Sequence, residues 1–242
     1  MLDFAGILFI GVTLAVLLAA IVTSLPLSLS GPLALAGIAG VWVSAAVGIV
    51  GKGGLSNLPT LLAMFGTPLL VAAGLALFSR SVRRMAGAVS TPMLIGLNVF
   101  RVGGILFVLL AAAGRLAGPF PYSAGWGDVL TGVFAVPAAW AATRETRRWD
   151  GLILAWNAFG MLDLVVAVAL GVTSRNGSPV QLFHAGVGTA AITTLPWALI
   201  PTVLVPLFLI DHAVIFARML ERTPYGSSER QAPFGQLGTA HR

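Results

Sequence analysis

Seven apolar runs of about 20 residues dominate this sequence and restrict it to one class of protein. An α-helix rises about 1.5 Å per residue, so a run of this length crosses the roughly 30 Å hydrocarbon core of a bilayer. We therefore expect an all-α membrane protein, a bundle of about seven transmembrane helices that forms a single domain over residues 1–222. The runs cover residues 4–22, 33–50, 61–78, 92–113, 127–143, 151–172 and 195–216.

The composition excludes a soluble domain and several kinds of catalytic chemistry. Only 9% of the 242 residues are charged and 57% are hydrophobic, whereas a soluble domain carries about 25% charged residues. The absence of cysteine excludes disulfides, iron–sulfur clusters and thiol catalysis. The only lysine, Lys52, lies outside the apolar runs, which excludes a Schiff-base retinal protein. Metalloprotease, serine-hydrolase and phosphate-loop motifs are missing, so nothing in the sequence points to a metal, a cofactor or an enzyme.

The basic residues predict the orientation of the bundle. Three of them, Lys52, Arg115 and Arg175, lie in loops on one side of the seven runs. The loops and tail of the other side hold ten, namely Arg80, Arg83, Arg84, Arg144, Arg147, Arg148, Arg218, Arg222, Arg230 and Arg242. Cytoplasmic loops are enriched in Lys and Arg, so this bias predicts an N-terminus outside and a C-terminus inside. The same distribution accounts for the net charge of +6 without a nucleic acid as partner.

Two segments near the C-terminus are expected to be irregular. Residues 178–194 are apolar but rich in Gly and Thr and too short for an eighth span, so they are predicted to be interfacial or re-entrant on the outer side. Residues 223–242 are polar and are predicted to form a disordered cytoplasmic tail. The run between them carries Pro196, Pro201 and Pro206. Each proline removes a backbone donor, so this helix should be bent and should need neighbours to satisfy its free carbonyls.

Arg101 and Asp163 are charged residues that lie deep inside apolar runs. Counted from the inner ends of their runs, they lie roughly 14 Å and 18 Å into the membrane, near its midplane. Each alone would cost at least about 2.5–3.5 kcal/mol to insert, so we expect them to form an ion pair. The pair could serve only to lock two helices together, or it could bind a solute or a proton. A third interpretation is that Arg101 snorkels without an acidic partner.

A second polar layer is predicted nearer the cytoplasm, about 9–10 Å from the inner surface. It contains Asn98, Asn157 and the adjacent pair Asp211 and His212. The asparagines are typical of interhelical hydrogen bonds worth about 0.6–2 kcal/mol. His212 beside a carboxylate could shuttle protons near neutral pH. Consecutive helical residues point about 100° apart, however, so Asp211 could instead face the arginine-rich inner edge.

Asp128 is expected at the outer start of the fifth helix, within the run 127–143. A carboxylate there would stabilise the free backbone amides of a helix N-terminus. Asp128 could also belong to the polar site.

Three stretches resemble a group of bacterial multi-pass membrane proteins of unknown function. They are AGWGDVLTG, NAFGMLDL and LPWALIPTVLVPLFLIDH, and the resemblance covers roughly residues 94–217. The resemblance implies a multi-pass protein of the bacterial cytoplasmic (inner) membrane, with the lipid bilayer as its surroundings. It implies no activity and assigns no functional residue.

Two functions remain open on the sequence. A small-solute or proton-coupled transporter or channel would place its polar site between the fourth and seventh spans. A non-catalytic membrane component or sensor would use the same buried charges only to fix helix packing. An intramembrane enzyme would need a clustered nucleophile or metal set, for which the polar residues are too few.

Overall fold

The structure, a computed structural model, describes residues 1–24, 30–144 and 146–222. Within these ranges the chain is helical and contains no β-strand, which confirms the expected all-α class. The predicted tail, residues 223–242, lies outside the described residues. The elements are α1 (Leu2–Ser24), α2 (Ser30–Gly51), η1 (Gly54–Ser56), α3 (Leu58–Phe78), α4 (Arg80–Ala88), α5 (Thr91–Leu97), η2 (Asn98–Gly104), α6 (Ile105–Ala112), α7 (Phe120–Thr143), η3 (Arg147–Trp149), α8 (Asp150–Thr173), η4 (Ala190–Thr193), η5 (Ile200–Leu204) and α9 (Val205–Arg222).

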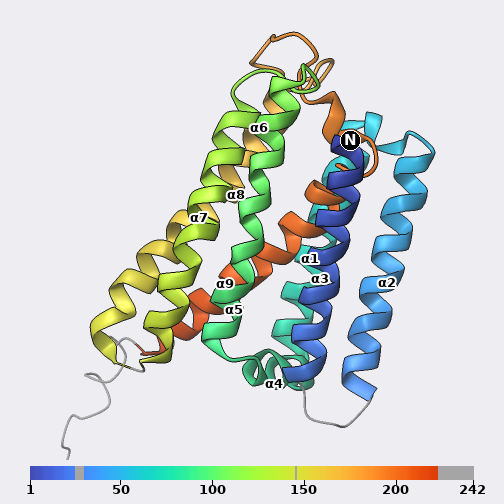
Figure 1. The fold of residues 1–242 in the computed structure, drawn as a ribbon. Helices are drawn as coiled ribbons and strands as arrows, with labels where there is room; N and C mark the ends of the chain where they lie inside the picture. Colours follow the sequence, from blue (N-terminus) through green and yellow to red (C-terminus); the bar gives the residue numbers. More distant parts are fainter. Residues whose placement is uncertain (25–29, 145, 223–242) are drawn as a thin grey trace, which may run out of the picture.

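The helices form one elongated bundle (Figure 1), and α7 packs more extensively against its neighbours than the other helices do. Helix α7 packs against α5, η2 and α6, and also against α8. Helix α9 runs obliquely across the bundle, where it contacts α3 and α8 (Figure 1). Small residues on α7, including Gly125, Gly132 and Ala135, are buried. They let neighbouring backbones approach closely, as is common in membrane bundles.

Within the part of the chain that the structure describes, five helical stretches are long and apolar enough to cross a membrane. The expectation of seven is therefore confirmed only in its coarser form, as a bundle of apolar helices. The predicted runs 33–50 and 127–143 correspond to α2 and α7, which are not among the five. The five stretches are Leu2–Ser24, Leu58–Phe78, Thr91–Ala112, Arg147–Thr173 and Ile200–Arg222.

The predicted helix over residues 92–113 is interrupted in its middle. The short α-helix α5 is followed by the 3₁₀ segment η2 and then by α6. Gly103 and Gly104 lie in this segment, and neither has room for a side chain. A Cβ on Gly103 would overlap the ring of Phe9, and one on Gly104 would overlap Asp128. The segment η2 is therefore closely packed on both of its sides at the point where the helix adopts the tighter 3₁₀ geometry.

The predicted helix over residues 195–216 is also wrong in its first part, before Val205. Residues 195–198 form turns, the π-helical segment η5 follows after Leu199, and the long helix α9 begins only at Val205. Pro206 has no N–H to donate to the carbonyl of Thr202, four residues earlier. Trp42 on α2 donates its Nε1–H to that carbonyl at 2.9 Å. A neighbouring helix therefore satisfies the carbonyl that the proline leaves free, as expected from the sequence.

The segment 178–194 packs at the end of the bundle that also holds the N-terminus (Figure 1). The amide of Ala117 donates to the carbonyl of Gly188 at 2.9 Å. Thr189 is fully buried and donates its hydroxyl to the carbonyl of Gly171 at 2.9 Å. The segment therefore caps the ends of α6 and α8 and adds no further crossing.

Candidate functional site

Arg101, in η2, lies at the centre of a buried polar cluster, with 3% of its surface exposed. Its Nε donates to Oδ1 of Asp128 at 2.7 Å, and its Nη2 donates to Oδ2 of Asp163 at 2.6 Å. Its Nη1 lies 2.9 Å from the carbonyl oxygen of Gly160 and 2.9 Å from Nε2 of His212. The ion pair predicted between Arg101 and Asp163 is present, and it is part of a larger set that joins η2, α7, α8 and α9.

Of the two roles expected for Asp128, the one at a helix N-terminus is wrong, and the structure instead places Asp128 in the polar cluster. Helix α7 begins at Phe120 and not at residue 127, so Asp128 lies two turns inside the helix, where the amides are already bonded. Its carboxylate instead accepts from Arg101. The sequence signal was available, because Asp128 is one of only four charged residues within the apolar runs. What the sequence did not show is that η2 and α7 lie side by side.

The cluster has more negative than positive charge. One guanidinium faces two carboxylates, and the side chains of Arg101, Asp128 and Asp163 are 1%, 15% and 8% exposed. With both carboxylates ionised, the ion pairs of Arg101 leave one negative charge uncompensated. Buried charge of this kind is costly in an apolar surrounding. A proton or another cation is therefore needed to balance the cluster.

His212 takes part in the cluster as a neutral acceptor. A guanidinium can only donate, so Nε2 of His212 must accept from Arg101. Its Nδ1 then carries the ring proton and donates to Oδ1 of Asn157 at 2.8 Å. Asn157 in turn donates its Nδ2–H to the backbone carbonyl of His212 at 3.0 Å. These bonds fix the ring in one tautomer and one orientation, and the indole of Trp156 packs beside it at 5.5 Å.

Asp211 and Asn98 form a second pair, in which neither side chain bonds to Arg101 or His212. Asn98 donates its Nδ2–H to Oδ2 of Asp211 at 2.7 Å and to the carbonyl of Leu94 at 3.2 Å. The Oδ1 atoms of both residues are buried and make no hydrogen bond within the described part of the chain. Asp211 thus bonds within the bundle and not to the ring of His212. The sequence predicted one polar layer around Arg101 and a second layer nearer the cytoplasm. Two members of the second layer, His212 and Asn157, in fact join the cluster around Arg101. The other two, Asp211 and Asn98, stay separate from it.

Glycines make the cluster geometrically feasible. A Cβ on Gly160 would lie 2.6 Å from Cε1 and 2.8 Å from Nε2 of His212, and 2.8 Å from Cγ2 of Thr131. A Cβ on Gly127 would overlap the carboxylate of Asp163. Gly160 and Gly127 are positions of the candidate site that were not predicted from the sequence. The signal was their place in FGMLD and WGD, next to or near the buried aspartates.

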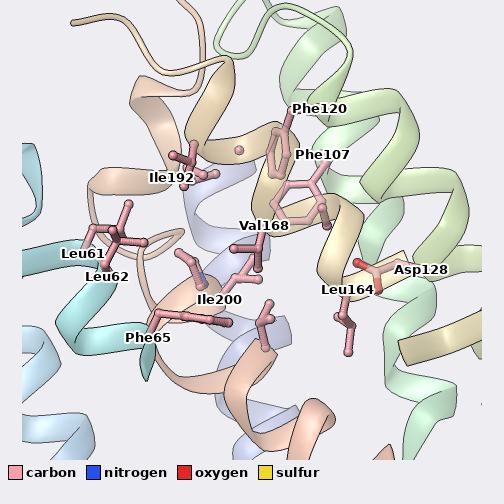
Figure 2. Close-up of a pocket in the computed structure, with 15 residues that line it drawn as sticks. Leu61, Leu62, Phe65, Phe107, Phe120, Asp128, Leu164, Val168, Ile192 and Ile200 are labelled. Carbon is pink, nitrogen blue, oxygen red and sulfur yellow. The ribbon is translucent and has the colours of Figure 1, made fainter. Parts of the chain in front are cut away.

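An apolar cavity of about 50 Å³ lies beside the cluster (Figure 2). Asp128 is the only ionisable residue in its wall. The other wall residues come from α3, α6, α7, α8 and the 192–205 region. A smaller neighbouring cavity is lined by Arg101, Asp128 and apolar residues. Among the described residues, no group of three or more His, Cys, Asp or Glu is placed to hold a metal ion.

Comparison with known proteins adds a family but no activity. The profile of a domain of unknown function (DUF8737) matches residues 58–220, which is more than half of the chain. The matched range begins at α3 and includes the whole polar cluster. No curated protein and no solved structure matches the chain.

Proposed function

The chain belongs to the DUF8737 family of domains of unknown function, and we propose that it moves protons, or a small solute coupled to protons, across the bacterial cytoplasmic membrane through the cluster around Arg101. The observation that carries this proposal is the charge of the cluster. Two carboxylates share one guanidinium away from water, so the cluster is neutral only when it holds an additional proton or cation. A site that must gain and lose one positive charge is suited to proton coupling.

The surrounding helices support the proposal. The cluster lies between the 3₁₀ segment η2 and the neighbouring helices α7, α8 and α9, and the π-helical segment η5 precedes α9. Interrupted helices near the middle of a membrane are characteristic of solute sites in transporters. Both small cavities are lined in part by residues of η5. This part of the chain would move most easily when the cluster changes its charge.

His212 provides a coupling between protonation and structure. Its Nε2 accepts from Arg101, so a proton arriving at Nε2 would place two positive donors against each other. Arg101 would then have to leave His212 while keeping its bonds to Asp128 and Asp163. Proton uptake would in this way shift η2 relative to α9.

We further propose seven spans, with the N-terminus outside and the C-terminus inside. In Figure 1 the chain alternates between two ends, with α2 and α7 crossing beside the five apolar helices. The N-terminus, the 113–119 loop and the 174–199 region lie at one end, and α4 lies at the other. The second end carries most of the basic residues, which favours the cytoplasmic side.

This topology can be tested with cysteines, because the chain has none of its own. Pro179 and Ser81 are both exposed, and they lie on opposite sides in the proposed arrangement. A membrane-impermeant thiol reagent is expected to label Pro179→Cys in intact cells and to label Ser81→Cys only after the cells are opened. The reverse pattern would invert the orientation, and labelling of both in intact cells would contradict the span count.

The proton proposal is tested by flux in reconstituted vesicles that contain a pH-sensitive dye. Asp163→Asn is expected to abolish pH-driven flux, at least tenfold, because an amide cannot take up the proton. The protein should stay folded, since Arg101 keeps Asp128 as a partner. Asp150→Asn is the matched control, at the start of the same helix and away from the cluster; it should retain full flux.

Two outcomes would contradict the proposal. Wild-type vesicles without flux above empty vesicles would favour the alternative, in which the cluster only fixes helix packing. That alternative is supported by the four hydrogen bonds that already occupy the Arg101 guanidinium. Full flux in Asp163→Asn would remove this carboxylate from the path. The variant His212→Gln then tests whether His212 carries the proton, since glutamine can accept a hydrogen bond from Arg101 but cannot titrate.

A further inference from the structure

We propose that the apolar cavity beside the cluster binds a protonated amine with an apolar body, whose ammonium group pairs with Asp128. As the substrate class of the transporter, this inference rests on the proposed function. Binding itself can be measured without transport. The cavity is defined by fifteen wall residues, of which Figure 2 labels ten.

The wall of the cavity determines the body of the ligand. Apart from Asp128, every wall residue is aliphatic, aromatic, Gly or Pro. Phe107 and Phe120 pack against each other with their ring centroids 5.2 Å apart, and Phe65 lies across the cavity from them (Figure 2). A compact hydrocarbon group therefore fits the surface that surrounds it.

Asp128 determines the head group. Its Oδ1 accepts from Arg101, whereas its Oδ2 makes no hydrogen bond with any residue that the structure describes. Its side chain is 15% exposed, compared with 1% for Arg101, so the carboxylate is the part of the cluster that reaches the cavity (Figure 2). An anionic head would meet a carboxylate in an apolar wall. A hydroxyl could donate to Oδ2 but would leave the excess negative charge.

An ammonium group satisfies both requirements. It donates a hydrogen bond to Oδ2 of Asp128, and it supplies the positive charge that the two carboxylates lack beside Arg101. Alkyl amines, like the lysine side chain, are protonated at neutral pH. The ammonium group would thus supply the positive charge that a proton supplies when no ligand is bound. This competition is the physical basis of exchange between an amine and a proton.

The test is calorimetric titration of the full chain in phosphatidylcholine nanodiscs with octylamine, octanol and octanoate. Empty nanodiscs correct for partitioning into lipid. Octylamine is expected to bind at least tenfold more tightly than octanol, and octanoate should not bind. Asp128→Asn should remove the preference for the amine, because it keeps the shape of the side chain but not its charge.

Two substitutions on α8 test whether octylamine binds in the cavity or elsewhere on the bundle. Val168 lies in the wall near the middle of the cavity (Figure 2), so Val168→Trp should weaken octylamine binding at least tenfold. Val165, three residues away, is 52% exposed and outside the wall; Val165→Trp should bind as the wild type does. Equal binding of octylamine and octanol to the wild type would overturn the proposal and show that the cavity only holds lipid chains. Unchanged binding in Val168→Trp would overturn it as well.

Binding and flux can fail independently. Proton flux without octylamine binding would refute this inference and leave the proposed function intact. Octylamine binding without flux would refute the proposed function and leave a membrane binding site for amines.

Discussion

Arg101→Leu is expected to lower the free energy of unfolding by about 3–5 kcal/mol, the typical cost of breaking a buried ion pair from one side. The substitution removes the positive charge that Asp128 and Asp163 share, so two carboxylates remain together in an apolar surrounding. It also removes the donors to the carbonyl of Gly160 and to His212. The measurement is thermal and denaturant unfolding in a mild detergent.

The partners of Arg101 are expected to behave differently from Arg101 itself. Asp163→Asn should cost much less than Arg101→Leu, because Arg101 keeps Asp128 and the cluster becomes neutral. The triple variant with Arg101→Leu, Asp128→Asn and Asp163→Asn should recover much of the loss, since no buried charge remains. Equal losses for Arg101→Leu and Asp163→Asn would show that the cluster does not carry excess negative charge. Purely additive losses in the triple variant would mean that the three groups do not interact.

Gly160→Ala is expected to destabilise the protein by about 1–3 kcal/mol, the usual cost of forcing an extra methyl group into a packed core. The new Cβ would lie 2.6 Å from Cε1 of His212 and 2.8 Å from Cγ2 of Thr131. Neither neighbour can yield easily. The ring of His212 is held by Arg101 and Asn157, and Thr131 donates to the carbonyl of Gly127 at 2.8 Å.

The control for this substitution is Gly151→Ala on the same helix. No atom lies within 4 Å of a Cβ at Gly151, so the change should be neutral or slightly stabilising through helix propensity. Both variants are compared by thermal unfolding, and Gly160→Ala should also lose proton flux. Equal melting temperatures for the two variants would show that α8 and α9 do not approach each other as closely as described.

The general character of this protein could be read from its sequence. Apolar runs of about 20 residues predicted the helices, because crossing a bilayer requires this length whatever the fold. The cost of buried charge predicted the partnership of Arg101 and Asp163 before their helices were placed, since each alone would be costly to insert. Proline at position 206 likewise predicted that another group must bond the carbonyl of Thr202, and Trp42 does so.

The tertiary structure alone decided which polar residues meet. In a membrane the lipid-facing side of a helix is as apolar as its packed side, so the sequence carries no clear periodic signal for the buried face. The interruptions at η2 and η5 also change the direction of the side chains that follow them, and their position depends on contacts such as that of Gly104 with Asp128. For these reasons His212 joins Arg101, while its neighbour Asp211 bonds Asn98.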